Sequence, residues 1–302
     1  MTRHFLRILD LDRTAAHGLL DRAGEMKRTR HQGQCMAGKA AIMLFEKAST
    51  RTRVSFEMAV RELGGSAIFM TTRESQLGRS EPLSDTARVL SRYVDCMIVR
   101  TFGQTKLDEL AYYASIPVVN ALSDDHHPCQ VMSDVLTMAE VKPDLENVRV
   151  AWVGDGNNMA QSLMEAAVHF PFELRLATPE GYDPDPNLVA VCREAGARLL
   201  LTRDPEEAVD GAHFVHTDVW ASMGQEGEAL DRSQVFAAYQ VNEDLMAAAD
   251  REARFMHCLP AHRGEEVSQE VMDGPRSIVW DQAENRLHMQ KAILEWLFTQ
   301  GN

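Results

Sequence analysis

The sequence reads Phe-Glu-Lys-Ala-Ser-Thr-Arg-Thr-Arg-Val-Ser-Phe-Glu at residues 45–57, and this stretch predicts how the chain folds. The apolar run just before it, residues 40–45, has the length of a buried strand. Behind it, apolar residues recur at the spacing of one helical stripe, at Val54, Met58, Ala59 and Leu63. Gly64 and Gly65 then end the helix. Residues 49–53 are therefore expected in the turn between a strand and a helix N-terminus.

This turn carries an unusual concentration of polar groups, namely Ser49, Thr50, Arg51, Thr52 and Arg53. The N-terminus of a helix presents unpaired N–H groups and the positive end of the helix dipole, so it binds oxyanions readily. An arginine can also hold a phosphate through two parallel hydrogen bonds. A capping Ser or Thr followed by solvated arginines would account for one hydroxyl but not for the whole cluster. The turn therefore predicts a phosphate site.

Apolar runs of strand length alternate with helical segments along the rest of the chain. The runs lie at residues 40–45, 67–70, 96–99, 117–120, 148–153, 212–216, 255–259 and 277–280. This alternation predicts an α/β fold of two doubly wound parallel-sheet domains, with a cleft at the carboxyl ends of the strands. We place the first domain at residues 1–142 and the second at 143–282. A C-terminal helix within residues 283–302 is expected to pack back on the first domain.

Composition excludes several classes of protein. The 302-residue chain has a formal net charge of −14 at pH 7, so non-specific binding to nucleic acid is not expected. Its apolar runs are too short to span a membrane, and its N-terminus lacks the apolar core of a signal peptide. The five scattered cysteines favour a reducing compartment over a disulfide framework. We therefore expect a cytoplasmic enzyme with neither a nucleic acid nor a membrane as partner.

Two further candidates are expected at the mouth of the first sheet. Arg100 follows the run at 96–99, and His127 lies in the loop after the run at 117–120. The carboxyl ends of parallel strands meet at one edge of a sheet, which is also where the phosphate turn opens. Alone, each residue is weak evidence, because an arginine at a strand end is usually a surface charge and a histidine before proline is often structural.

Taken together, the motifs resemble the aspartate/ornithine carbamoyltransferase family. Residues 49–53 resemble its carbamoyl-phosphate motif, and residues 127–130, His-Pro-Cys-Gln, resemble its His-Pro-x-Gln motif. Residues 218–224, Asp-Val-Trp-Ala-Ser-Met-Gly, resemble the Asp-x-x-x-Ser-Met-Gly loop of the ornithine branch, which the aspartate branch lacks. Residues 257–260 match the family's His-Cys-Leu-Pro motif. The four motifs stand in the family order.

The resemblance implies which residues hold carbamoyl phosphate. They are Ser49, Thr50, Arg51, Thr52, Gln76, Arg100, His127, Gln130, Cys258, Leu259 and Arg286. Of these, Thr52, Arg100 and His127 would polarise the carbonyl oxygen, on which negative charge develops during attack. Gln130 and the Leu259 backbone would receive the carbamoyl NH₂ group. Gln76 lies in a loop that members of this family lend to a neighbouring subunit.

The resemblance also implies an amino-acid substrate, held by Asn158, Asp218, Ser222 and Met223, with Asn157 as an open alternative to Asn158. Asp218 would meet the α-amino group of ornithine. Cys258 is expected near the δ-amine, although an isolated cysteine of unknown role is more often a core residue.

The implied reaction is direct transfer of the carbamoyl group to the δ-amine of L-ornithine, giving L-citrulline and phosphate, as in arginine biosynthesis and the urea cycle. Arg100, His127, Asp218 and Cys258 would be the catalytic residues. The reaction needs neither a cofactor nor a metal. The resemblance further implies a homotrimer or a multiple of trimers. Substrate choice is less firmly implied than reaction type, because enzymes that use acylated ornithine differ in the loop around Gln76.

Three other functions remain as alternatives. Gly154-Asp155-Gly156 after a strand suggests a dinucleotide-binding oxidoreductase, but Met159 stands where the third glycine belongs. A metal hydrolase could draw ligands from a scattered set of side chains, although no H-E-x-x-H or paired C-x-x-C motif exists. That set is His126, His127, Cys129, His257, Cys258 and His262. A non-catalytic binding module would keep the phosphate site and form no product.

Overall fold

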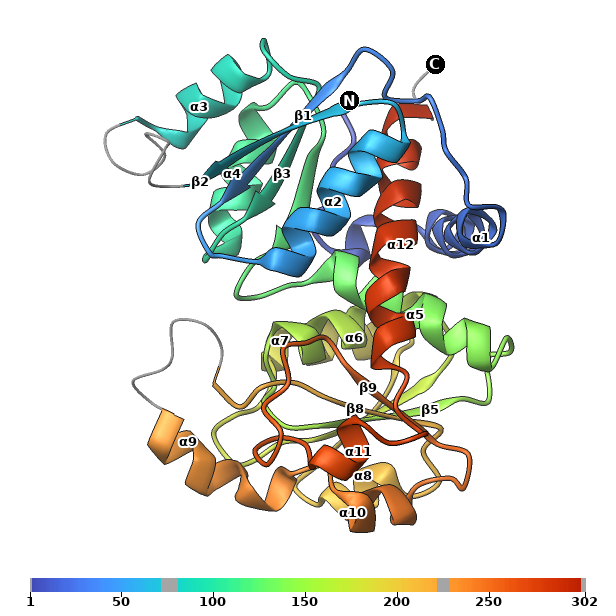
Figure 1. Ribbon diagram of the computed structural model, residues 1–302. Helices are drawn as coiled ribbons and strands as arrows, with labels where there is room; N and C mark the ends of the chain where they lie inside the picture. The colour runs from blue at the N-terminus through green and yellow to red at the C-terminus, as the bar shows by residue number, and fades with distance from the viewer. Residues whose placement is uncertain (1, 72–80, 222–228, 300–302) are drawn as a thin grey trace. The chain divides into compact units, whose positions relative to one another are not determined.

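The computed structural model describes residues 2–71, 81–221 and 229–299 (Figure 1). The chain forms two compact units, which we call unit 1 (Met1–Leu136 with Asn285–Asn302) and unit 2 (Thr137–Glu284). It passes from one unit to the other inside α5 (Pro128–Val141) and inside α12 (Val279–Thr299). Each unit has its own parallel sheet, so the predicted α/β class is confirmed. The domain limits at residues 142 and 282 stay a prediction.

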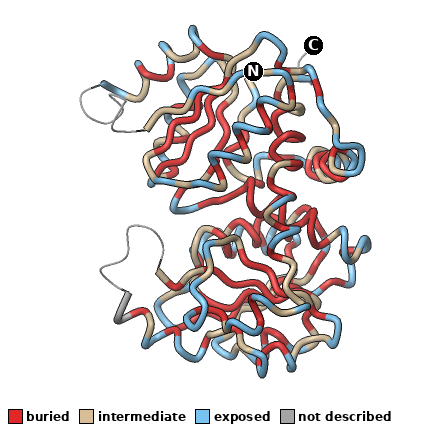
Figure 2. Tube along the Cα trace, viewed as in Figure 1, coloured by how far each residue is buried: buried red, intermediate tan, exposed pale blue. Residues whose placement is uncertain are grey.

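Unit 1 is built on a four-stranded sheet in the order β2-β1-β3-β4. Its strands are β1 (Ala40–Phe45), β2 (Ser66–Thr71), β3 (Cys96–Arg100) and β4 (Val118–Leu122). The two central strands β1 and β3 are buried almost throughout, as their continuous apolar sequences require (Figure 2). The parallel register sets Phe45 beside Arg100 and Arg100 beside Leu122. The residues that follow these strands therefore emerge at one edge.

The helices of unit 1 precede, connect and follow the strands of this sheet along the chain. They are η1 (Ile8–Asp10), α1 (Arg13–Thr29), α2 (Thr50–Glu62), α3 (Leu83–Leu90), α4 (Gln104–Tyr113) and parts of α5 and α12. Residues 285–299 of α12 belong to this unit, which confirms the expected return of the C-terminal helix.

Helix α2 differs from its prediction in two respects. It begins at Thr50, so the polar cluster forms its first turn and does not precede the helix. The predicted stripe is also wrong at Val54 and Met58, whose exposed fractions are 54% and 37%. Ala59 and Leu63 are buried as predicted, and Phe56 and Val60 are buried in place of Val54 and Met58. The buried face is rotated because the bulky Phe56 faces the core, a choice that the apolar periodicity alone does not make.

Unit 2 is built on a five-stranded parallel sheet in the order β7-β6-β5-β8-β9. The strands are β5 (Arg149–Val153), β6 (Glu173–Ala177), β7 (Arg198–Thr202), β8 (Phe214–Thr217) and β9 (Arg254–His257). The chain runs outward from β5 to β7 and then returns to β8 on the other side of β5. This reversal of strand order is the switch point at which α/β sheets bind ligands.

Short helices connect and cover the strands of unit 2. They are α6 (Asn158–His169), α7 (Pro186–Glu194), α8 (Pro205–Val209), α9 (Ala229–Phe236), η3 (Ala237–Tyr239), α10 (Glu243–Ala248) and α11 (Gln269–Met272). Aromatic side chains, among them Trp220, Phe236 and Phe255, are buried in the core of this unit.

The strand predicted at residues 277–280 is wrong. Ser277 forms only an isolated bridge to Phe255, and α12 begins at Val279. The Gln282 N–H already donates to the Ile278 carbonyl at 3.0 Å, so helical hydrogen bonding takes over immediately. The final helix is therefore longer at its N-terminus than the predicted start near residue 283.

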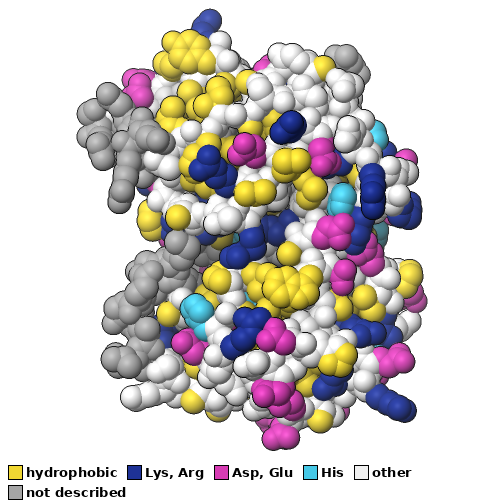
Figure 3. Space-filling model, in the orientation of Figure 1, with side chains coloured by type: hydrophobic (Ala, Val, Ile, Leu, Met, Phe, Trp, Pro, Cys, Tyr) yellow, Lys and Arg dark blue, Asp and Glu magenta, His cyan; other side chains and the backbone are white. Residues whose placement is uncertain are grey.

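The surface carries charges of both signs. On the face shown in Figure 3, acidic and basic side chains are interspersed within each unit. No helix among residues 2–71, 81–221 and 229–299 combines the length and the apolar character that crossing a membrane demands.

Candidate active site

The polar groups of residues 49–52 are arranged around the first turn of α2. Ser49 is the N-cap, and its Oγ accepts a hydrogen bond from the Thr52 backbone N–H at 3.3 Å. This is the ordinary capping role of a serine. Thr50 is exposed and Arg51 is half-buried, and Arg51 forms no ion pair with any residue that the structure describes. One hydroxyl of the cluster is thus engaged in capping, which does not account for the other polar groups of the turn.

Helix α12 brings an arginine to the same turn. Arg286 is buried, and its Nη2 donates to Thr52 Oγ1 at 2.7 Å. Thr52 is itself only 1% exposed, so this contact lies beneath the surface. A charge on a helix is usually solvated, but this one is directed at the first turn of α2.

Two more of the sequence candidates lie at the edge of the unit 1 sheet. Arg100 is the last residue of β3, and His127 directly precedes α5; both are buried. Burial lowers the pKa of His127 well below 6.5, and the positive charges of Arg286 and Arg100 lower it further. The imidazole is therefore neutral at pH 7. Arg100, Arg286 and the neutral His127 therefore lie close enough to interact electrostatically. Together they offer hydrogen-bond donors suited to an anionic oxygen.

Gln130 lies in the first turn of α5, where it is 1% exposed. Its Nε2 donates to Asp134 Oδ1 at 2.9 Å, which orients the amide. The Oε1 atom accepts no hydrogen bond from any residue that the structure describes. A buried carbonyl oxygen of this kind is costly unless a donor reaches it. It is suited to receive the N–H of a ligand amide.

Glu46 has a structural role that the sequence reasoning missed. Its backbone N–H donates to the Arg100 carbonyl at 2.8 Å, and its carboxylate accepts from Lys106 Nζ at 2.9 Å and from Thr101 Oγ1. The loop after β1 is thereby tied to the loop after β3. The sequence feature that could have indicated this role is the position of Glu46 immediately after a buried strand.

In unit 2, Asp218 and Cys258 lie next to one another because their strands are paired. Thr217 of β8 is in register with His257 of β9, so the following residues emerge together. The Cys258 thiol donates to Asp218 Oδ1, with Sγ and Oδ1 3.0 Å apart. Asn157 Nδ2 donates to Asp218 Oδ2 at 3.1 Å. The buried Asp218 carboxylate is thus oriented by hydrogen bonds to both of its oxygens.

The two candidate asparagines lie at the start of α6. Asn157 is the N-cap of α6, where its Oδ1 accepts from the Met159 N–H at 2.9 Å while its Nδ2 contacts Asp218. Both ends of this amide are therefore engaged within the protein. Asn158 is the half-buried first residue of α6. Asn158 also has a contact of its own within the protein, so the choice between the two asparagines as the ligand contact stays open, and Asn158 stays a prediction.

Behind Cys258, a fully buried pair supports the turn of the His-Cys-Leu-Pro motif. The Leu259 N–H donates to His257 Nδ1 at 2.8 Å, so we assign the ring proton to Nε2, which faces Glu266 Oε1 at 3.1 Å. Leu259 adopts a left-handed φ of +63°, which is rare for a branched side chain. The sequence marked His257 as a potential metal ligand, whereas the structure shows it orienting this backbone.

Arg232 is a second residue that the sequence reasoning missed. Its Nε donates to the Trp220 carbonyl, its Nη2 pairs with Asp155, and its guanidinium lies 4.7 Å from the Tyr182 ring centroid. It therefore connects the segment after Asp218 to the turn after β5. Nothing in the local sequence signals this role, because Arg232 and its partner Asp155 are 77 residues apart in the chain.

Three of the candidate residues, Gln76, Ser222 and Met223, lie outside the described residues. Their assignments therefore stay predictions, as do the ligand contacts assigned to the residues above.

Two clusters of metal-type ligands occur among the residues that the structure describes. Ligand atoms lie within 4.8 Å of one another in Asp218, His257 and Cys258, and again in His262, Glu265 and Glu266. In the first cluster both ring nitrogens of His257 already have protein partners. Neither cluster includes His126 or Cys129, which belong to unit 1. The set assembled for a metal hydrolase is thus not brought together as one site in this part of the chain.

Buried histidines make the folded state sensitive to acid. Burial lowers the pKa of His126 to about 4 and that of His216 to about 3. The unfolded chain takes up protons below about pH 6.5 while these folded-state rings stay neutral, so stability falls as pH decreases from 6.5 toward those values. We expect the free energy of unfolding to lose up to about 1.4 kcal/mol per pH unit for each such histidine.

Urea unfolding at pH 7, 6 and 5 measures this dependence. The His216→Gln variant removes one titrating ring that is not among the candidate site residues, so its stability should decline less steeply than that of the wild type. Parallel declines in the two proteins would show that His216 does not contribute.

Comparisons with known proteins agree over the whole chain. The family model described as aspartate/ornithine carbamoyltransferase, carbamoyl-P binding domain, matches residues 3–140, and the Asp/Orn binding domain of the same family matches 146–297. The chain is 66% identical to an ornithine carbamoyltransferase of Nitratidesulfovibrio vulgaris over 300 residues, covering 99% of this chain and 100% of the relative. It is 67% identical to that of Oleidesulfovibrio alaskensis over 297 residues, covering 98% and 99%.

Solved structures show the same similarity. The ornithine carbamoyltransferase of Pyrococcus furiosus superposes with a TM-score of 0.95 at 45% identity, covering 99% of this chain and 98% of that one.

Proposed function

The chain belongs to the aspartate/ornithine carbamoyltransferase family, and from this premise we propose that it is the ornithine-using enzyme. It transfers the carbamoyl group of carbamoyl phosphate to the δ-amine of L-ornithine and releases L-citrulline and phosphate, a step of arginine metabolism. The observation that carries this choice is the Cys258–Asp218–Asn157 arrangement in unit 2. It sets an oriented carboxylate at the start of the Asp-x-x-x-Ser-Met-Gly segment, where an amino-acid ammonium group needs a partner.

Unit 1 holds the phosphate in this proposal. Ser49, Thr50, Arg51 and Thr52 surround the N-terminus of α2, and Arg286 contacts Thr52. Helix N–H groups and guanidinium donors complement a phosphate dianion in charge and geometry. Gln76 would complete the site from a neighbouring subunit.

The carbamoyl group is polarised by donors at the same edge. Negative charge develops on its carbonyl oxygen as the amine attacks, and Thr52, Arg100 and His127 supply hydrogen bonds there. His127 acts as a neutral donor, since burial and the nearby guanidinium groups lower the pKa of its imidazole. Gln130 Oε1 and the Leu259 backbone receive the carbamoyl NH₂ group.

Unit 2 holds ornithine, with Asp218 on the α-amino group and Asn158, Ser222 and Met223 on the amino-acid backbone. The δ-amine must be neutral to attack, and neutralising an alkylammonium with a pKa near 10.4 costs about 4–5 kcal/mol at pH 7. Burial of the amine among positive charges would reduce that cost by disfavouring the charged form. Cys258 lies beside Asp218 and is assigned to the amine end of the substrate.

The bonds change in one transfer. The nitrogen lone pair attacks the carbamoyl carbon, the bond from that carbon to the phosphate oxygen breaks, and phosphate leaves with the electron pair. The amine proton passes to the departing phosphate, assisted by Asp218 and Cys258. Holding two small substrates in reactive orientation supplies much of the remaining acceleration. This chemistry requires no cofactor or metal.

A single set of assays tests the function. Purified protein is supplied with carbamoyl phosphate and, separately, ornithine, N-acetylornithine, N-succinylornithine, putrescine or aspartate, and the carbamoylated product is measured. The proposal predicts product with ornithine at a kcat/KM well above the others. A preference for an acylated ornithine would reassign the substrate, and no product with any amine would favour a binding module.

We further propose a homotrimer, or a multiple of trimers, in the cytoplasm. The five cysteines are all free thiols, as suits a reducing compartment. Sedimentation equilibrium of the purified protein measures the assembly, and a monomer at micromolar concentration would contradict it.

A further inference from the structure

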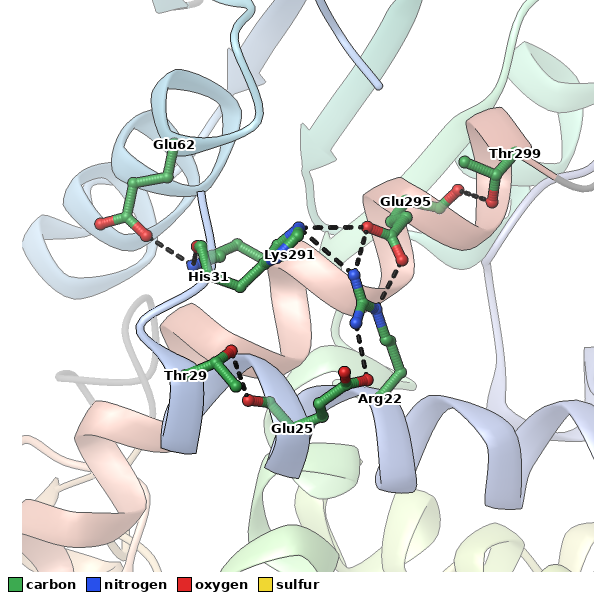
Figure 4. A network of polar contacts seen from close by, with 8 residues as sticks. All are labelled: Arg22, Glu25, Thr29, His31, Glu62, Lys291, Glu295 and Thr299. Atoms are coloured by element: carbon green, nitrogen blue, oxygen red, sulfur yellow. Dashed lines mark hydrogen bonds and ion pairs between the residues drawn. The ribbon is translucent and has the colours of Figure 1, made fainter. Parts of the chain in front are cut away.

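Helix α12 carries a lysine whose ammonium group is buried inside unit 1. Lys291 is 0% exposed, and its Nζ donates to Glu62 Oε2 at 2.6 Å and to the His31 carbonyl (Figure 4). Glu62 is the last residue of α2, and His31 lies just beyond α1. A single ammonium group thus contacts two segments that are remote from α12 in the sequence.

The Lys291 side chain is fully buried and that of Glu62 is 22% exposed, and an ion pair buried to this degree is weak evidence for stability. The cost of removing the ammonium group fully and the carboxylate partly from water offsets most of their attraction, and an apolar pair of similar volume usually serves as well. Such a pair does, however, penalise any shift that separates its members, because a displaced ammonium group would be buried without a partner. The contact therefore favours one register of α12 against α2.

This register matters because α12 touches α2 at both ends. Arg286, five residues before Lys291, donates to Thr52 Oγ1 in the first turn of α2, and Lys291 meets Glu62 in its last turn. Thr52 and Glu62 are about 15 Å apart along the helix at 1.5 Å per residue. Sliding or rotating α12 to lose the Lys291 contact would move Arg286 away from Thr52.

We propose that Lys291 is a positioning residue, whose ion pair with Glu62 holds Arg286 at the phosphate-binding turn. This inference rests on the proposed function, in which that turn binds carbamoyl phosphate. Lys291 itself touches no substrate in this account and acts through Arg286.

The same helix provides a matched control. Glu295, one turn beyond Lys291, accepts from Arg22 of α1 through Nε at 2.6 Å and Nη2 at 3.0 Å (Figure 4). This ion pair also anchors α12, but to α1, and it does not reach α2. Glu295→Gln should therefore leave phosphate affinity unchanged, although it weakens the anchoring of the helix.

The experiment compares Lys291→Met, Glu295→Gln and the double variant Lys291→Met/Glu62→Leu with the wild type. In Lys291→Met we expect Arg286 to lose its contact with the phosphate, and the loss of one charge-assisted contact lowers affinity about tenfold. The KM for carbamoyl phosphate and the Kd for inorganic phosphate should therefore each rise about tenfold. The KM for ornithine should stay within about twofold of the wild-type value, because no contact assigned to ornithine is lost; losing one would change it about tenfold. Calorimetric titration with inorganic phosphate supplies the Kd independently of turnover.

The double variant separates positioning from stability. Removing both charges should restore the thermal midpoint toward the wild-type value, because neither ion is then buried alone. The phosphate Kd should remain raised, since the apolar pair does not specify the register. Phosphate affinity that recovers together with the thermal midpoint would overturn the proposal, as would a Lys291→Met variant with wild-type affinity.

Failure of the proposed function and failure of the Lys291 proposal give different results. Wild-type protein that binds inorganic phosphate but carbamoylates no amine would contradict the function, while the phosphate Kd values of the variants would still decide the role of Lys291. Wild-type protein that forms citrulline, with equal phosphate affinity in all variants, would contradict only the role of Lys291.

Discussion

The Arg51→Ala variant is expected to lose about 10²–10³-fold in kcat/KM for carbamoyl phosphate, the loss that follows removal of one donor from an oxyanion site. Arg51 lies in the first turn of α2, is half-buried and forms no ion pair with any described residue. Its guanidinium is therefore available for a ligand at the helix N-terminus. Steady-state kinetics with carbamoyl phosphate varied at saturating ornithine give the measurement, and circular dichroism checks that the variant folds.

Arg53→Ala is the matched control, because it removes the same charge from the same turn. Arg53 is exposed, lies 3.8 Å from the Phe69 ring centroid, and has its Nε 3.8 Å from Glu57 Oε2. These protein contacts engage its guanidinium, so kcat/KM should change by only about threefold or less, the scale of an exposed ion pair. Equal losses in both variants would mean that general positive charge, and not a phosphate contact at Arg51, supports turnover.

The Asp218→Asn variant should lose about 10²–10³-fold in kcat/KM for ornithine, because one member of a buried charge pair with the substrate ammonium is removed at a cost of about 2–4 kcal/mol. Asparagine has nearly the same shape and can retain the contact with the Val219 N–H, which donates to Asp218 Oδ1 at 2.8 Å. Its NH₂ group cannot accept from Asn157 Nδ2, so the loss should reflect the removed charge together with that hydrogen bond. The Kd for inorganic phosphate should stay close to the wild-type value.

Asp183→Asn provides the comparison for this variant. Asp183 is another carboxylate of unit 2, paired with Arg203 through Oδ1 and Nη1 at 2.6 Å, but its side chain is 42% exposed. Its substitution should leave kcat/KM for ornithine unchanged. If Asp218→Asn used ornithine as well as Asp183→Asn does, the assignment of Asp218 to the amino-acid substrate would be wrong.

The parts of the site that could be predicted follow from local pattern and from strand direction. The apolar run at residues 40–45 and the polar residues after it predict a strand that leads into a helix N-terminus, and β1 and α2 have this arrangement. Arg100 and His127 were placed at one edge because parallel strands end at the same side. The structure brings their side chains close enough for Arg100 to lower the pKa of His127.

Other features could not be predicted, because they depend on contacts between distant segments. Periodicity identified α2 as amphipathic, yet it could not tell that Phe56 is buried and Val54 exposed. Residues 277–280 have the composition of a strand, but after the bridge at Ser277 they enter α12. The support that Glu266 gives to His257 arises only once the loop after β9 has folded back.

By itself, the sequence determined the α/β class, the chain order of the motifs and the chemical character of the turn at residues 49–53, because these depend on neighbours along the chain. Only the tertiary structure decided that Arg286 meets Thr52, that Asp218 meets Cys258 and that Lys291 meets Glu62. These contacts join segments up to 234 residues apart. Their geometry depends on strand register and helix packing. These depend on contacts throughout each unit, so no local sequence pattern encodes them.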